Sequence, residues 1–305
     1  MEFFKNKTNI DYIKQKKIAM IFSILIAIFS SYFLITNGLN LGLDFTGGTQ
    51  LEVTSKQNIN IQTLREQFDA ANFHDIIIQT YGSKNNALIR IGSNNFNNQQ
   101  QLKQKIKQTI GTNIQIVRSE YIGPQVGKTL LENGILAIVV SLLATMLYIA
   151  IRFEFRFAIS AAVSLIHDPV LILGFFAFYQ LEFNLISLAA ILTILGYSLN
   201  DTIVVYDRVR ENFKLFKNKT PSEIINLSIN ETLSRTLITS GVTLLVVIAL
   251  CLLGGSTLQD FAIALILGII IGTYSSIYVA GSLAVFLGLN RQSLLPEIKS
   301  SVLQV

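Results

Sequence analysis

Cysteine, tryptophan, proline and charge are all scarce in this chain. Its 305 residues include one cysteine, four prolines and no tryptophan, and only 14% of them are charged. The single cysteine, Cys251, excludes a disulfide within the chain and a zinc site built from cysteines. With 51% hydrophobic residues and a mean hydropathy of +0.51, the chain is too apolar for one ordinary soluble domain.

The hydrophobic residues are gathered in long runs. Four runs carry no charge, and each has the ~18 to 20 residues that a helix needs to cross about 30 Å of hydrocarbon. Two further runs are equally long but contain His167, Asp168 and Asp201. We therefore predict an α-helical polytopic membrane protein with six transmembrane helices, at residues 18–36, 130–151, 157–181, 183–206, 235–256 and 261–290.

The cations alternate between connections. Lysine and arginine occur in 1–17, between the second and third spans, in 207–234 and in 291–305, whereas the connections at Glu182 and at 255–260 have none. Because Lys and Arg near span ends stay in the cytoplasm, we expect both termini and the 207–234 loop there. The long core of the first run predicts an uncleaved helix and not a signal peptide. This topology explains the net charge of +5, which therefore indicates no nucleic-acid partner.

A polar segment, 37–129, separates the first two spans and has short alternating runs. The pattern predicts strands at 49–55, 75–81, 87–92 and 113–121, and helices at 61–72 and 98–110. This βαββαβ order predicts an inserted α+β ferredoxin-like domain on the side opposite the termini. No catalytic constellation lies in it, so we expect a binding or mechanical module.

One motif resembles a phosphate-binding loop. In Gly123–Thr129, however, three residues separate the two glycines where that loop needs four, and a span follows directly. We therefore expect no nucleotide, and the sequence predicts no other cofactor and no metal.

Ionisable residues within spans are the candidates for function. Each costs at least ~2.5 to 3.5 kcal/mol to insert, so such residues face a bundle interior or water. A rise of ~1.5 Å per residue places Asp201 and Arg235 at similar depth, where they could meet. A moving arginine could load and unload Asp201 with a proton. Alternatively, the two form a static buried ion pair, or Asp201 is hydrated near the cytoplasmic surface. Asp207, Arg208, Arg210 and Glu211 are expected to form a solvated helix end.

Six motifs follow one another over nearly the whole chain: Leu43–Thr49, Ile122–Gly127, Arg152–Glu154, Ile166–Asp168, Gly196–Asn212 and Glu231–Thr236. In this order they resemble the SecF members of the SecD/SecF family of protein-export membrane proteins, within the resistance-nodulation-division superfamily. The resemblance implies a bacterial inner-membrane subunit with its 37–129 domain in the periplasm. Its implied partners are SecD, the SecYEG channel, YajC and exported unfolded polypeptide.

The resemblance also implies roles for single residues. Asp201 is implied to be the acidic residue linked to proton movement and Arg235 its basic counterpart, so that the proton-motive force drives late steps of translocation. Secondary candidates are His167, Asp168 and Asn200. A structural joint between the first span and the first strand is expected from Asp44, Gly47, Gly48, Gly123 and Pro124.

Two other functions remain open. A six-helix proton-coupled carrier of a small solute would need a polar pocket at mid-membrane, and the spans offer little beyond His167 and Asp168. A noncatalytic scaffold of the channel would hold Asp201 and Arg235 as a static pair. An enzyme is the least expected reading, because no nucleophile, metal cluster or cofactor motif is recognisable in the sequence.

Overall fold

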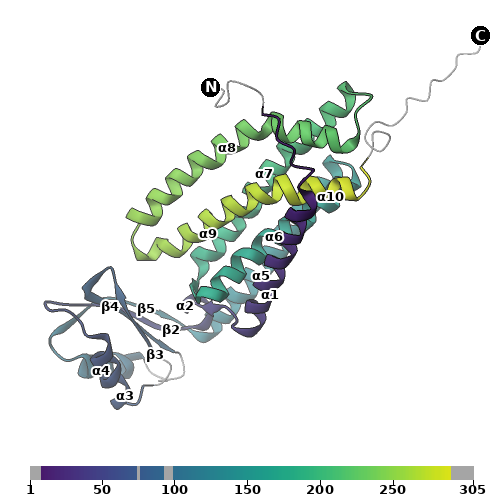
Figure 1. The fold of residues 1–305 in the computed structure, drawn as a ribbon. Helices are drawn as coiled ribbons and strands as arrows, with labels where there is room; N and C mark the ends of the chain where they lie inside the picture. The colour runs from purple at the N-terminus through teal and green to yellow at the C-terminus, as the bar shows by residue number, and fades with distance from the viewer. Residues whose placement is uncertain (1–7, 74–75, 93–98, 290–305) are drawn as a thin grey trace, which may run out of the picture.

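A bundle of long helices and a small α/β unit make up the computed structural model (Figure 1), which describes residues 8–73, 76–92 and 99–289. Six helical runs within those residues are long and apolar enough to cross a membrane, as the sequence predicts. They are α1 (Lys16–Thr36), α5 (Pro124–Arg152), α6 (Phe155–Tyr179), α7 (Leu185–Leu215), α8 (Pro221–Leu253) and a last run formed by α9 (Ser256–Tyr274), the π-helix η2 (Ser275–Ala280) and α10 (Gly281–Phe286).

Helices α7 and α8 extend well beyond the predicted spans. The expected loop 207–234 is helical except at residues 216–220. Helix α8 begins early because Thr220 and Glu223 form a capping box and Pro221 occupies the first turn, where its missing N–H costs nothing. The extra turns also bury apolar side chains, among them Phe213 and Ile225. Of the expected cytoplasmic termini, residues 1–7 and 291–305 lie outside the described residues, as does residue 290.

The α/β unit has six elements in the order strand, helix, strand, strand, helix, strand. They are β2 (Gly48–Ser55), α3 (Ile61–Ala70), β3 (Ile76–Tyr81), β4 (Ser83–Gly92), α4 (Gln99–Ile110) and β5 (Ile114–Ile122). The sheet order is β3-β4-β2-β5 with antiparallel neighbours. Strand β4 begins before the predicted residue 87, because the hairpin turns tightly at Gly82. Residues 75 and 98, the predicted starts of a strand and a helix, lie outside the described part.

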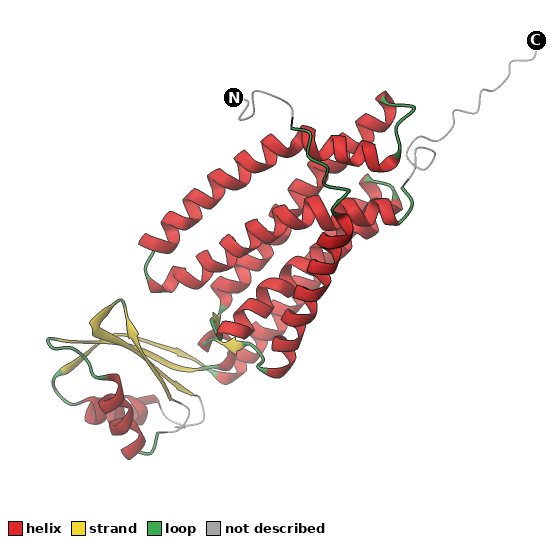
Figure 2. Ribbon diagram, viewed as in Figure 1, coloured by secondary structure: helices red, strands yellow, loops and turns green. Residues whose placement is uncertain are grey.

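Both helices of this unit cover one face of its sheet (Figure 2). Leu64 and Phe68 of α3 and Ile106 of α4 pack there against Leu51 and Ile89 of the sheet. The alternation of strand side chains leaves the other face, which carries Gln50 and Arg90 among others, turned toward the helical bundle.

A compact joint connects the two parts. The two-residue strand β1 (Asn40–Leu41) pairs in parallel with β6 (Glu182–Phe183), and the one-turn helix α2 (Leu43–Thr46) follows β1. Gly47 and Gly48 have φ angles of +69° and +131°, which side chains rarely adopt. A Cβ on Gly47 would also lie 2.9 Å from the Cα of Pro124, and a Cβ on Gly48 would overlap the carbonyl oxygen of Ile91. The paired glycines therefore let the chain turn tightly from α2 into β2, where it passes close to the start of α5 and to the neighbouring strand β4.

Candidate functional site

Asp201 is buried in the wall of the helical bundle. Helix α7 carries it, and the side chain of Asn184 caps the start of this helix by accepting from the Ser187 N–H at 2.9 Å. Only 3% of Asp201 is exposed, and its Oδ2 has no hydrogen-bond partner among the described residues. The alternative of an Asp201 hydrated near the surface is therefore wrong for this conformation. A buried oxygen without a donor is costly, and such a group is a candidate for function.

Arg235 does not pair with Asp201 in this conformation. It lies on α8 with an exposed side chain, and it acts on Asp201 only through the longer range of its positive charge. The static buried ion pair is thus not what the structure contains. Asn200, one of the secondary candidates, is exposed on α7 beside Asp201. The relay roles of these residues stay predictions.

A second buried carboxylate has many partners. Asp168 on α6 is completely buried, and its Oδ2 accepts from the Ser198 hydroxyl at 2.6 Å and from the Ser275 hydroxyl at 2.9 Å. Its Oδ1 lies 3.0 Å from Nδ1 of His167, whose Nε2 is buried and has no partner in the part of the chain that the structure describes. This carboxylate therefore joins three helical segments, α6, α7 and η2.

The same cluster continues along α7 toward Asp201. The Thr202 and Ser276 hydroxyls lie 2.9 Å apart, and the carbonyl oxygen of Ser198 accepts from both, at 3.1 and 3.3 Å. Helix α9 approaches α7 closely here, and Gly272 permits this approach because it has no side chain. A Cβ on Gly272 would lie 3.1 Å from the Cβ of Ser198. The serines were not predicted, because hydroxyls are common in spans. Gly268 and Gly272 on α9 are four positions apart, a spacing that allows another helix to approach closely.

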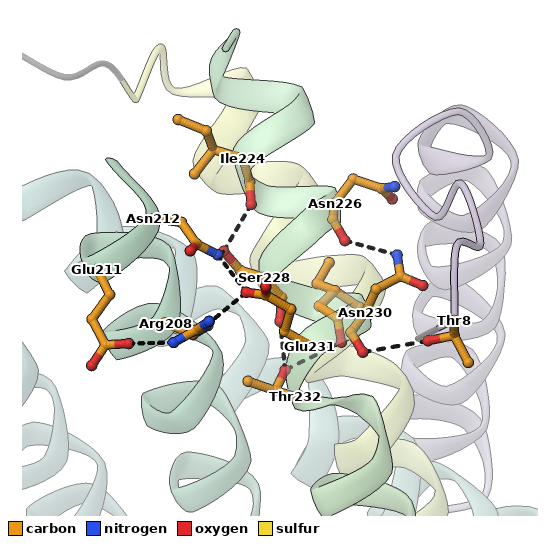
Figure 3. A network of polar contacts seen from close by, with 11 residues as sticks. Thr8, Arg208, Glu211, Asn212, Ile224, Asn226, Ser228, Asn230, Glu231 and Thr232 are labelled. Carbon is orange, nitrogen blue, oxygen red and sulfur yellow. Dashed lines mark hydrogen bonds and ion pairs between the residues drawn. The ribbon is translucent and has the colours of Figure 1, made fainter. Parts of the chain in front are cut away.

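A third polar cluster lies where α7 meets α8 (Figure 3). Arg208 donates at 2.7 Å to Glu231 and at 2.7 Å to Glu211. The buried Asn212 donates at 2.9 Å to the Ser228 hydroxyl and at 2.8 Å to Glu231. The four residues predicted to form a solvated helix end are partly or fully exposed, Arg208 at 36% of its side chain, but α7 does not end there and continues to Leu215.

The N-terminal segment is fastened to α8 beside this cluster, and Figure 3 shows Thr8 beside Asn230. Asn230 accepts from the Ile10 N–H at 2.9 Å and donates to the Ile10 carbonyl at 2.8 Å. Asn226, one turn earlier, accepts from the Tyr12 N–H at 2.8 Å and donates to the Ile10 carbonyl at 3.1 Å. Two asparagines thus hold the backbone of this segment, and Tyr12 and Ile13 pack in the apolar core.

Replacing both Asn226 and Asn230 by Ala is expected to release this segment. The two side chains make five hydrogen bonds to the segment, including one from the Ile13 N–H to Asn226 at 3.4 Å. At about 0.5 to 1 kcal/mol each, their loss is expected to lower the local free energy of opening by about 2 to 5 kcal/mol. Hydrogen exchange at the Ile10 and Tyr12 amides should accelerate roughly 30-fold or more. Asn218→Ala, in the exposed α7–α8 connection, serves as the control and should leave both rates unchanged. Unchanged protection in the double variant would show that the apolar contacts alone hold the segment.

At the opposite end of the bundle, a cavity of about 620 Å³ lies between the open sheet face and the joint. Arg90 crosses it, forming an ion pair with Glu182 of β6 and donating from Nε to Gln50 at 3.2 Å. Burial lowers the pKa of Arg90, and the charges of Asp260 and Asp44 oppose that effect. Asp44 itself accepts from the Leu185 N–H at 2.9 Å and so also caps α7. The α/β unit is therefore tied to the bundle through both polar contacts and the joint.

Known proteins share this arrangement. The family described as "Protein export membrane protein SecD/SecF, C-terminal" matches residues 101–290, and the "SecD/SecF GG Motif" matches residues 32–59. The protein translocase subunit SecF of Vibrio alginolyticus is 45% identical over 299 residues, which are 97% of this chain and 95% of that protein. SecF of Rickettsia prowazekii (strain Madrid E) is 39% identical over 284 residues, covering 92% and 91% of the two chains.

Solved structures agree. The crystal structure of SecDF, a translocon-associated membrane protein from Thermus thermophilus, has a TM-score of 0.85 and 34% identity, and the similarity covers 93% of this chain. This chain spans only 39% of the length of that SecDF chain. A structure of SecDF in the super-membrane-facing form has a TM-score of 0.71. Together with six apolar helices, these likenesses confirm the resemblance read from the motifs: the chain is a multi-pass inner-membrane protein and belongs to the SecD/SecF family.

Proposed function

We propose that this chain is the SecF-like subunit of the Sec protein-export machinery and that, with SecD, it couples the proton-motive force to late steps of translocation. The buried carboxylate of Asp201, which has no hydrogen-bond donor at Oδ2, carries the proposal. An anion at this place would need a donor or a cation to come closer. Binding and release of a proton by Asp201 would therefore accompany a movement, and Arg235 on α8 is the cation best placed to make it.

SecD is the proposed partner within the membrane. Asn200 and Arg235 are exposed on the bundle surface. Polar side chains on a membrane bundle are better covered by another protein than by lipid, which supports a second subunit at this surface. The SecDF chain, of which this chain spans 39%, supports that assignment. SecYEG, YajC and exported unfolded polypeptide are proposed as the further partners.

The α/β unit is proposed to be a periplasmic ferredoxin-like domain, with both termini in the cytoplasm. Its βαββαβ order and the antiparallel sheet order β3-β4-β2-β5 support the fold assignment. The alternation of Lys and Arg between connections supports the orientation. In this arrangement, movement at Asp201 reaches the domain through α7, whose start contacts the joint at Asp44.

The proposal is tested by export of a secreted precursor in cells depleted of their own copy. Supplying this chain together with SecD should restore export, and the restored part should disappear when a protonophore collapses the proton-motive force. Restoration by this chain without SecD would contradict the partnership. Restored export that survives the protonophore would contradict the coupling and leave a noncatalytic scaffold as the function.

A further inference from the structure

Asp168 is a completely buried side chain with three polar partners that the proposed function does not use. Two hydroxyls from different segments, Ser198 on α7 and Ser275 on η2, converge on one of its oxygens. His167 lies at the other oxygen. A charged carboxylate inside a membrane bundle is tolerated only with such partners, because each lost hydrogen bond cannot be replaced by water. The position of α7 and η2 relative to α6 therefore decides how well this group is stabilised.

Ser198 and Asp201 lie on the same face of α7, since they are three positions apart. Both side chains are buried, and Thr202 continues the hydroxyl cluster on this face. A shift or rotation of α7 that brings Asp201 toward or away from a cation must therefore also move the Ser198 hydroxyl relative to Asp168. The titratable groups at this cluster are Asp168 itself, His167 beside it on α6 and Asp201 on α7.

The π-helix η2 supplies the third side of the cluster. Its first two residues point to different helices: Ser275 donates to Asp168 on α6, whereas Ser276 contacts Thr202 and the Ser198 carbonyl on α7. A π-helical turn is rare and less stable than an α-helical one, and it often occurs at functional sites. Here it allows two consecutive serines to bridge α6 and α7. The wide turn is thus maintained by the same contacts that would change when α7 moves.

We propose that Asp168 is a positioning residue that transmits proton binding at Asp201 to α6 and η2, through the making and breaking of its hydrogen bonds with Ser198 and Ser275. This inference rests on the proposed function, because it assumes that Asp201 binds the coupling proton. It adds a second carboxylate, whose part in the cycle is to hold α7 and η2 through hydrogen bonds. Close packing gives this cluster two arrangements: either the Ser198 hydroxyl of α7 donates to Asp168, or α7 moves and that hydrogen bond is lost.

The test compares four forms of the full chain, co-expressed with SecD at matched levels: wild type, Asp168→Asn, Asp201→Asn and the double variant. The readout is the rate of precursor export with and without the proton-motive force. The difference between the two rates is the export driven by the proton-motive force, which we call the driven part. Asp168→Asn is expected to lower the driven part roughly tenfold or more. The double variant is expected to match Asp201→Asn within about twofold, because both changes interrupt one step. Ser164→Ala is the control, since this buried hydroxyl of α6 has no hydrogen-bond partner, and it should export like wild type.

Three results would overturn the inference. The first is that Asp168→Asn exports as fast as wild type when the proton-motive force is present. The second is that Asp168→Asn loses export equally with and without the proton-motive force, and the third is that the double variant loses the product of the two single losses. Should Asp168→Asn fail to accumulate, Ser198→Ala and Ser275→Ala each remove one donor and keep the carboxylate, and the same comparison applies to them. Normal export by Asp201→Asn would instead contradict the proposed function itself. The Asp201→Asn arm therefore separates the two failures.

Discussion

Asp201→Asn is expected to remove nearly all export that depends on the proton-motive force while SecD still co-purifies. Asparagine has nearly the same shape and adds an amide donor, so the packing of α7 should survive, but it cannot bind and release a proton. One proton crossing 100 mV provides about 2.3 kcal/mol. A step that loses this drive slows by up to roughly 50-fold. The measurement is the rate of precursor export at matched expression in cells depleted of their own copy.

The matched control is Asp207→Asn, two turns farther along α7. Asp207 faces Arg152 at 3.4 Å in a half-exposed pair, and such pairs contribute little. Export by this variant should stay within about twofold of wild type. If Asp201→Asn also exports normally, the carboxylate takes no part in coupling, and the scaffold function gains support.

Gly48→Ala is expected to have the largest effect on stability. The new methyl group would overlap the Ile91 carbonyl oxygen in the neighbouring strand, and the residue would keep a φ near +131° that alanine rarely adopts. Backbone strain and overpacking each cost about 1 to 3 kcal/mol, so we expect a loss of about 3 kcal/mol in the free energy of opening of the sheet. Amide exchange in β2 and β4 of the full chain should then accelerate by roughly 100-fold.

Gly82→Ala is the control that carries a backbone cost without a steric clash. Gly82 also has a positive φ, of +69°, but a Cβ there would meet nothing within 4 Å. Only the backbone cost remains, about 1 kcal/mol. Equal exchange rates in the two variants would show that the sheet yields easily at Ile91 and that the joint is less tightly packed than its contacts indicate.

The spans were predictable because the membrane selects for a property that sequence displays directly, a long uncharged apolar run. Where a helix leaves the membrane, that signal ends, and the capping box at Thr220 then decides the true start of α8. The two-residue strands β1 and β6 have no pattern of their own, because pairing over two residues requires no alternation. The sequence therefore showed the number of spans better than it showed their connections.

The candidate site was predictable as a set of residue types and not as a geometry. Charge within a span singled out His167, Asp168 and Asp201, because burial makes ionisable groups expensive. Depth counting also placed Arg235 level with Asp201, yet counting along a helix axis carries no information about which way a side chain points. Arg235 faces outward in this conformation. Ser198 and Ser275 contact Asp168 only through the packing of three segments distant in sequence, which no local pattern encodes.

The pairing of β1 with β6 also constrains the order of events during biosynthesis. Asn40 and Gln180, which meet beside this pair, are 140 residues apart, and two long helices lie between β1 and β6 in the chain. At about 5 to 20 residues per second, the ribosome needs roughly 7 to 30 s to produce the second strand after the first. Within that interval, once β5 has been made, the α/β unit can complete its own sheet while the edge of β1 remains unpaired. A nascent chain stalled before residue 182 should therefore contain a folded α/β unit and an incomplete joint. Assembly factors or proteases can reach the unpaired β1 in that state, but not in the completed protein.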